Sequence, residues 1–417
     1  MDESVLDKLK ILAESAKYDV SCASSGTSRG HKAGAIGSAA GWGICHSFAE
    51  DGRCISLLKI MLTNYCRYDC AYCINRRSND IPRATLSVTE LVNLTIEFSR
   101  RNYIEGLFLR SGVRNPDYTM ERLVRIVKDL RTIHRFNGYI HLKGIPGASP
   151  ELIHEAGLYA DRMSVNIEIP NEKSLQTLAP EKDFQSVFTP MRHIQQGVLE
   201  SAEERKKYRS APRFAPAGQS TQMIIGATPD SDKDILRLSS ALYQRPTMKR
   251  VYYSGFVPVN AYDNRLPQLK QPPLVRENRL YQADWLLRFY QFKVDEIVDD
   301  SYPDLDLEID PKLAWALRHP EKFPVDINRA DYELLLRIPG LGVKSAKMII
   351  VSRRYGKING SQLKKMGVVL KKAQYFITCN ELPLQTVQEL RPERVRQLLI
   401  PHKGKQEDPR QLKIIFE

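Results

Sequence analysis

The residues best suited to chemistry in this sequence are three cysteines within eight positions. Cys66, Cys70 and Cys73 lie in the stretch TNYCRYDCAYCINRRSND. The stretch follows ISLLKIML, an apolar run from Ile55 that is typical of a buried strand. The chain has seven cysteines, and clustering of three of them fits a reducing compartment and a metal site better than a disulfide framework.

Three interpretations of this trio compete. A structural zinc site normally uses four ligands, often as two distant CxxC pairs, and the sequence has no second pair. Buried structural thiols are a second option, although three in one loop directly after a strand would be an unusual packing solution. The third is an iron–sulfur cluster: a [4Fe–4S] cube usually takes four thiolates, so three would leave one iron open to a small molecule.

The CxxxCxxC spacing after a first strand, with Tyr72 directly before the third cysteine, resembles the radical SAM superfamily. The resemblance implies that Cys66, Cys70 and Cys73 hold a [4Fe–4S] cluster and that S-adenosylmethionine (SAM) binds the open iron. One electron would then cleave SAM into methionine and a 5′-deoxyadenosyl radical that abstracts hydrogen from a substrate. It also implies an electron donor such as flavodoxin or ferredoxin. No residue is assigned as catalytic.

Further SAM contacts follow from the same resemblance. GLFLRSGVR stands where the family has a Gly-Gly-Glu-like motif, although it holds one matching glycine and no acidic residue. SVNIEIP resembles the strand that holds the ribose, and alternation places its polar residues on one face. MIIGATPDSDKDIL resembles a later element beside the adenine. The predicted cofactor-binding residues are Tyr72, Arg110, Ser111, Gly112, Ser164, Asn166, Glu168 and Gly226.

Three more cysteines lie upstream, at Cys22, Cys45 and Cys54. They could ligate an auxiliary cluster. Because their wide spacing is not specific to any metal site, we interpret them as buried or incidental thiols.

From Ile55 onward, short apolar strands alternate with amphipathic helices in about six β/α units. Such alternation favours a parallel sheet that curls into a barrel. We therefore predict the α/β class: a partial (β/α)6 radical SAM barrel with a C-terminal all-α helix–hairpin–helix domain. The predicted strands span residues 55–62, 104–110, 138–145, 162–169, 220–226 and 250–258.

The changes in pattern along the chain predict five regions. They are an N-terminal helix with a Gly/Ser-rich loop region (1–54), the radical SAM barrel (55–262), a helical connector (263–322), a helix–hairpin–helix nucleic-acid-binding domain (323–380) and a basic C-terminal tail (381–417).

Charge is concentrated in the C-terminal part of the chain. The whole sequence carries +13, of which the segment from Phe323 to the end carries +9. Between Glu333 and Glu381 there is no acidic residue. A basic face on a compact segment indicates a polyanion partner, whereas a merely solvated surface would not require the complete loss of acidic residues.

The segment NRADYELLLRIPGLGVKSAKMIIVSRRYG predicts two helices joined by a Gly-x-Gly turn. Asn328 with Asp331 suggests the helix start, and Pro339 the end of the first helix. A turn of this kind exposes backbone N–H groups that suit a phosphate. The segment resembles the helix–hairpin–helix motif of DNA repair and recombination proteins; a plain αα-hairpin in a core is the alternative. The predicted nucleic-acid-binding residues are Gly340, Leu341, Gly342, Lys344, Lys347, Arg353 and Arg354.

A second, weaker hairpin is predicted between Met366 and Lys372. A pair of hairpins commonly grips both strands of a duplex, so DNA is favoured over RNA. The chain as a whole resembles radical SAM proteins assigned to DNA modification or repair, whose genes are often linked to that of a uracil-DNA-glycosylase-like partner.

The function predicted on these grounds is a radical SAM enzyme that modifies or repairs a nucleotide in DNA. Radical modification of RNA such as tRNA, or a non-catalytic iron–sulfur DNA-binding protein, are the alternatives. No apolar run is long enough to span a bilayer, and the charged N-terminus MDESVLDKLKILAESAKYDV is unlike a signal peptide. We therefore expect a cytoplasmic protein without a membrane partner.

Overall fold

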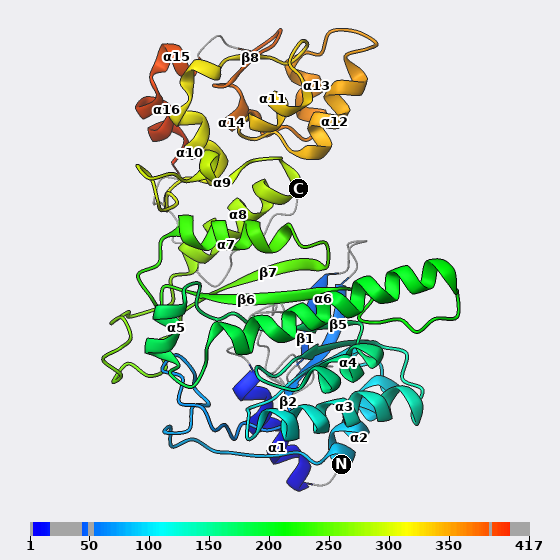
Figure 1. The fold of residues 1–417 in the computed structure, drawn as a ribbon. Helices are drawn as coiled ribbons and strands as arrows, with labels where there is room; N and C mark the ends of the chain where they lie inside the picture. Colours follow the sequence, from blue (N-terminus) through cyan, green and yellow to red (C-terminus); the bar gives the residue numbers. More distant parts are fainter. Residues whose placement is uncertain (1–2, 17–43, 49–53, 383–385, 401–417) are drawn as a thin grey trace, which may run out of the picture. The chain divides into compact units, whose positions relative to one another are not determined.

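The computed structural model describes residues 3–16, 44–48, 54–382 and 386–400 (Figure 1). Cys22 and the end of the basic tail (401–417) lie outside the described residues, and for Cys45 and Cys54 only the backbone is described. By contacts between residues, the chain divides into two units. Unit 1 comprises 1–230 and 241–273, and unit 2 comprises 231–240 and 274–417. Among the described helices, none has the length and apolar character needed to cross a bilayer.

Unit 1 is built on a seven-stranded sheet whose strands lie in chain order. The first pair is antiparallel, and the other pairs are parallel. The six parallel strands confirm the predicted curled α/β sheet. The strands are β1 (Ile44–Phe48), β2 (Cys54–Met61), β3 (Gly106–Arg110), β4 (Tyr139–Lys143), β5 (Arg162–Ser164), β6 (Gln219–Ile225) and β7 (Met248–Gly255).

Helices follow the parallel strands, and consecutive ones pack side by side along the sheet (Figure 1). Their starts are encoded locally: Ser87 and Glu90 form a capping box, and Asn115 caps the next helix. The core lies between these helices and the sheet, where Leu107 and Leu109 of β3 are fully buried. The helices are α1 (Glu3–Ala16), α2 (Val88–Arg100), α3 (Pro116–Thr132), α4 (Pro150–Tyr159), α5 (Glu172–Leu178), α6 (Phe184–Lys207) and α7 (Asp232–Tyr243), the last of which crosses into unit 2.

One predicted strand is shorter than expected. The sequence pattern extends it to residue 169, whereas β5 ends at Ser164. The physical reason lies at Glu168, whose φ of +64° places it in the left-handed region that a strand cannot contain. Its N–H still donates to the carbonyl of Gln222 (2.9 Å), and its carbonyl accepts from Ile224 (2.7 Å). The segment therefore stays beside β6 while its side chains are re-aimed.

Unit 2 holds the connector helices together with the C-terminal helices. The sequence predicted an all-α region, but a pair of two-residue strands also lies here. Aromatic side chains form its centre: Trp315 meets Phe323 edge-on at 6.2 Å, and Phe323 meets Phe376 at 5.1 Å. The elements are α8 (Leu274–Phe289), α9 (Val294–Ile297), α10 (Pro311–Arg318), η1 (Pro320–Lys322), β8 (Val325–Asp326), α11 (Tyr332–Arg337), α12 (Val343–Ser352), α13 (Gly360–Lys365), α14 (Leu370–Ala373), β9 (Ile377–Thr378), α15 (Val387–Leu390) and α16 (Pro392–Leu399).

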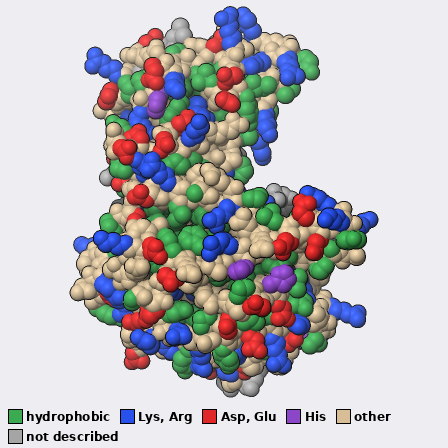
Figure 2. Space-filling view, viewed as in Figure 1, with side chains coloured by type: hydrophobic (Ala, Val, Ile, Leu, Met, Phe, Trp, Pro, Cys, Tyr) green, Lys and Arg blue, Asp and Glu red, His purple; other side chains and the backbone are tan. Residues whose placement is uncertain are grey.

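The start of α11 differs from the prediction. Asp331 is its N-cap and accepts from the N–H of Leu334 at 2.7 Å. Asn328 instead bonds the backbone of Ile358 through both side-chain atoms, at 2.8 and 3.2 Å. Lys and Arg side chains stand out on the part of unit 2 that contains α12 and α13 (Figure 2).

Candidate cofactor site

The three clustered cysteines lie in the loop that follows β2. Cys70 is buried, and Cys66 and Cys73 are half-buried. Within the loop, the N–H of Cys73 donates to the carbonyl of Cys70 (3.0 Å). The N–H of Ala71 donates to Leu178 at the end of α5 (2.7 Å). The loop is thus a fixed element of unit 1 and not a loose connection.

Two side chains satisfy the backbone carbonyls of this loop. Asn260, fully buried, donates through Nδ2 to the carbonyls of Ala71 (2.6 Å) and Cys73 (3.0 Å). The guanidinium of Arg83 donates to four carbonyls of the loop, those of Asn64, Asn75, Arg76 and Asn79. Because a loop lacks the internal hydrogen bonds of a helix or strand, such donors hold its shape.

A glycine allows the end of β3 to meet the cysteine loop. The N–H of Gly112 donates to the carbonyl of Thr63 at 2.7 Å. A Cβ at this position would lie 2.3 Å from the carbonyl oxygen of Tyr65, a distance that no side chain can adopt. The single glycine of the predicted SAM motif therefore has a structural reason to be present.

A buried ion pair fixes the far end of the loop. Arg76 donates to Asp263 at 2.6 Å, and both side chains are less than 8% exposed. Arg265 also bonds Asp263, at 2.6 Å. Hydrogen bonds from Arg265, with those from Arg76, hold the pKa of the Asp263 carboxyl far below its usual range, despite the opposing effect of burial.

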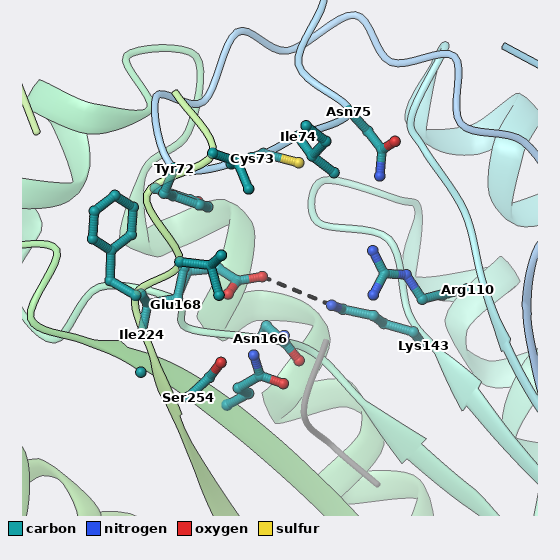
Figure 3. A pocket seen from close by; sticks show the side chains of 15 residues that line it. Tyr72, Cys73, Ile74, Asn75, Arg110, Lys143, Asn166, Glu168, Ile224 and Ser254 are labelled. Carbon is teal, nitrogen blue, oxygen red and sulfur yellow. Dashed lines mark ion pairs between the residues drawn. The ribbon is translucent and has the colours of Figure 1, made fainter. Parts of the chain in front are cut away.

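Beside the cysteines, unit 1 contains two adjoining hollows of about 570 and 740 Å³, and Figure 3 shows the smaller one. They lie where the parallel strands end, which is the usual ligand-binding edge of such sheets. The larger one contains all three cysteines. The residues that line both hollows are Tyr72, Cys73, Asn75, Arg110, Lys143, Asn166 and Glu168.

Several buried polar atoms of this cavity find no hydrogen-bond partner among the described residues. They are Oδ1 of Asn75, Nδ2 of Asn166 and Oε1 of Gln222. A buried polar atom without a partner costs about 1–3 kcal/mol. Three such atoms around one cavity fit a polar ligand such as SAM, whose amino, carboxylate, ribose and adenine groups offer both donors and acceptors.

Charged side chains complete the cavity. Lys143, at the end of β4, pairs with Glu168 at 3.7 Å, and both are less than 20% exposed (Figure 3). Lys182 lines the larger hollow and lies 5.5 Å from the ring centre of Tyr68. Burial alone would lower the pKa of Lys182, but the nearby Cys70, Tyr72, Glu168 and Cys66 raise it well above its usual value.

Two of the thiols, Cys70 and Cys73, border an apolar cluster. Cys70 packs with Ala71, Ile169 and Phe256 in one buried cluster. Burial raises the pKa of Cys70, and burial together with the other two thiols raises the pKa of Cys73 to about 12. The described residues include no group of His, Cys, Asp or Glu able to hold a single metal ion. Thiolates on a cube bind different irons, so their sulfurs are spaced more widely than the ligands of one ion.

The cavity brings together most of the residues predicted to bind SAM. Tyr72, Arg110, Ser111, Gly112, Asn166 and Glu168 line the larger hollow with the three cysteines. Ser164 does not: it is buried, lines neither hollow and bonds Nε2 of His141 at 2.9 Å. Gly226 lines neither hollow, and a Cβ there would meet Pro273 at 3.0 Å.

Sequence reasoning missed other residues of the site. Lys143 could have been found, because it ends a predicted strand at the edge where the cysteine loop lies. Asn260 gave no local signal, since it is a lone asparagine after the last strand. The missed residues are Asn75, Lys143, Lys182, Gln222, Ser254 and Asn260.

Comparison with known proteins agrees with this geometry. Residues 60–210 match the Radical SAM superfamily. No protein of curated function matches the chain in sequence.

Similar solved structures include two of HydG, a maturase of the [FeFe]-hydrogenase. One has 16% identity and a TM-score of 0.32 over 46% of this chain and 50% of its own. The other, from Carboxydothermus hydrogenoformans, has 12% identity and a TM-score of 0.44 over 81% of this chain and 74% of its own. Methylornithine synthase (PylB) has 15% identity and a TM-score of 0.41 over 55% of this chain and 61% of its own.

The chain thus spans only half the length of the first of these proteins, and nothing about its substrate follows from such distant likenesses. The sequence match, in contrast, covers the cysteine loop and the strands from β3 to β5 that carry Arg110, Lys143 and the segment with Asn166. Residues 60–210 therefore form a radical SAM domain, and the cofactors of this domain are a [4Fe–4S] cluster and S-adenosylmethionine.

Proposed function

We propose that this chain is a radical SAM enzyme that modifies or repairs a nucleotide within DNA. The observation that carries the DNA part of the proposal is a pair of glycine turns in unit 2. The turns contact each other within the stretch that lacks acidic residues.

In unit 1, Cys66, Cys70 and Cys73 would hold the cluster. When bound, the cluster supplies the electron that cleaves SAM into methionine and a radical able to take hydrogen from a substrate. Asn75, Asn166 and Gln222 would offer their unpaired atoms to the polar groups of SAM. The apolar cluster around Cys70 would keep water away from the reactive centre.

The first glycine turn joins α11 and α12. Gly340 has a φ of +78°, and a Cβ there would lie 2.7 Å from the carbonyl oxygen of Val369. Gly342 is the N-cap of the ten-residue helix α12. Because glycine has no side chain to accept a hydrogen bond, no N-cap side chain caps the first N–H groups of this helix. Uncapped N–H groups together with the helix dipole favour a phosphate at this position.

The second turn joins α13 and α14 and is built in the same way around Gly367, with a φ of +82°. Two hydrogen bonds join the turns. The N–H of Val369 donates to the carbonyl of Gly340 (2.8 Å), and the hydroxyl of Ser345 donates to the carbonyl of Met366 (2.8 Å). Two adjacent turns of this kind suit two phosphate backbones, which supports duplex DNA as the partner.

The basic residues around these turns divide into two groups. Arg353 donates through Nη1 to the carbonyls of Ile327 and Ala330 and is thus tied to the packing of unit 2. Arg337 and Lys372 are likewise paired, with Glu296 and Asp310. The exposed basic side chains are Lys344, Lys347, Arg354, Lys357, Lys364, Lys365 and Lys371.

Two protein partners belong to the proposal. The cluster needs an electron donor, such as flavodoxin or ferredoxin, to start each SAM cleavage. A uracil-DNA-glycosylase-like protein would act on the same DNA. Radical modification of RNA is the second candidate, because exposed lysines and uncapped N–H groups contact any phosphate backbone.

Binding and turnover test the proposal separately. At matched salt, we expect the full chain to bind duplex DNA more tightly than a structured RNA; the reverse order would favour the RNA enzyme. Under anaerobic conditions, the reduced protein should convert SAM to 5′-deoxyadenosine, and deuterium from labelled DNA should appear in that product. If the cluster is intact but no 5′-deoxyadenosine forms, the enzyme proposal fails and the chain is a non-catalytic iron–sulfur protein.

A further inference from the structure

A buried lysine lies directly beneath the first glycine turn. Lys312 belongs to α10, not to the hairpin, and is only 7% exposed. Its Nζ donates to the carbonyl oxygen of Leu341 at 2.6 Å and lies 4.7 Å from the ring centre of Tyr290. Burying an ammonium group is costly unless it is well bonded, so its place under this turn calls for a specific role.

The bond to Leu341 has a geometric consequence. In a trans peptide, the carbonyl and the following N–H point in opposite directions. Because Lys312 holds the carbonyl of Leu341 toward the interior, the N–H of Gly342 points away from it. Gly342 is the residue that opens α12, so its N–H joins the uncapped N–H groups of that helix.

We propose that Lys312 is a positioning residue for nucleic-acid binding, which fixes the Leu341–Gly342 peptide so that its N–H faces a backbone phosphate. The inference rests on the proposed binding of DNA by unit 2. Lys312 also places a positive charge beneath the turn without contacting the phosphate. Sequence reasoning could not find it, since Lys312 lies outside the acid-free stretch.

The titratable and charged groups around Lys312 are Tyr290 directly after α8, Asp310 at the start of α10, Arg337 of α11 and Lys372 of α14. Tyr290 at the end of α8 faces it with its ring, and Asp310 precedes it. Burial lowers the pKa of Lys312 to about 7, Asp310 opposes this effect, and Arg337 and Lys372 add to it. A phosphate on the turn favours the charged amine, so affinity for DNA should fall as the pH rises through about 7.

The test is fluorescence anisotropy of the full chain with a labelled DNA duplex at constant salt between pH 6 and 8.5. For the wild type, we expect the Kd to rise with pH. Lys312→Met should raise the Kd about tenfold at pH 6 and remove this pH dependence. Lys270→Met, which removes the same charge from an exposed position in unit 1, should keep the wild-type profile.

Each outcome has one meaning. If the wild type binds neither duplex DNA nor structured RNA, the proposed function fails. If it binds, but Lys312→Met has the same Kd and pH profile as wild type, only the role of Lys312 is overturned. Should Lys312→Met not fold, as judged by circular dichroism, the wild-type profile decides: a Kd that does not change between pH 6 and 8.5 overturns the role.

Discussion

Replacing Gly342 with aspartate should change stability and DNA binding in opposite directions. Gly342 has an ordinary φ of −90°, and the nearest atom to an added Cβ is Oη of Tyr290 at 3.7 Å, so unit 2 has room for the side chain. Aspartate is a better N-cap than glycine, and its charge suits the helix dipole. We therefore expect α12 to gain about 0.3–1 kcal/mol.

A phosphate on the same N–H groups would meet that carboxylate. Two unit charges about 5 Å apart at an effective dielectric constant of about 20 repel by about 3 kcal/mol. Gly342→Asp should therefore raise the Kd for duplex DNA more than 100-fold, while the midpoint of thermal unfolding stays equal or rises.

Gly342→Asn is the matched control, because it has nearly the same shape and capping ability without the charge. Anisotropy should show a much smaller loss for asparagine, and the difference between the two variants should shrink as salt is added. Equal DNA affinity of the asparagine and aspartate variants at low salt would refute the assignment of this turn to a phosphate.

Three further predictions concern unit 1. Gly112→Ala should destabilise the cysteine loop, because the added Cβ would lie 2.3 Å from a backbone oxygen. The control Gly144→Ala should be tolerated, because its Cβ would lie 3.2 Å from a side-chain methyl. Iron content and the absorbance of the reconstituted cluster measure the difference. Asn260→Ala should cost about 2–3 kcal/mol in urea unfolding, since two carbonyls lose their donor, and an unfolding free energy equal to that of wild type would contradict it. Asp263→Asn should cost about 3–5 kcal/mol at neutral pH. Because the pKa of Asp263 is lowered in the folded protein, the ionised carboxylate stabilises the fold above the unfolded pKa near 4, and this stabilisation is lost as the pH falls through the folded pKa. In urea unfolding below pH 4, the variant should therefore lose less stability than wild type.

The sequence predicted best what is encoded locally. The cysteine spacing and the strand–helix alternation depend on neighbouring residues, and the parallel sheet was found where the pattern indicated. Glu168 was expected in a strand because alternation cannot reveal a left-handed backbone. Asn260 was missed because its partners lie 189 and 187 residues away, so no local pattern could relate them.

The basic stretch shows the same limit in unit 2. Counting charges treats Arg353 and Lys344 alike, yet Arg353 bonds backbone carbonyls and Lys344 is exposed. Conversely, Lys312 carries no signal in its own segment, and only the packing of α10 beneath the turn reveals its contact with Leu341.

The anchoring of the cysteine loop also constrains how the protein matures in the cell. Cys66 is synthesised early, but Asn260 and Asp263, which complete its loop, emerge from the ribosome almost 200 residues later. During that interval Arg83 is already present, but the loop lacks Asn260, which bonds two of its carbonyls, and Asp263, which accepts from Arg76. Iron delivered to the nascent chain would meet a flexible peptide, whereas iron delivered after β7 and the following loop have folded meets a preformed site. Cluster insertion should thus be a step that follows translation of unit 1.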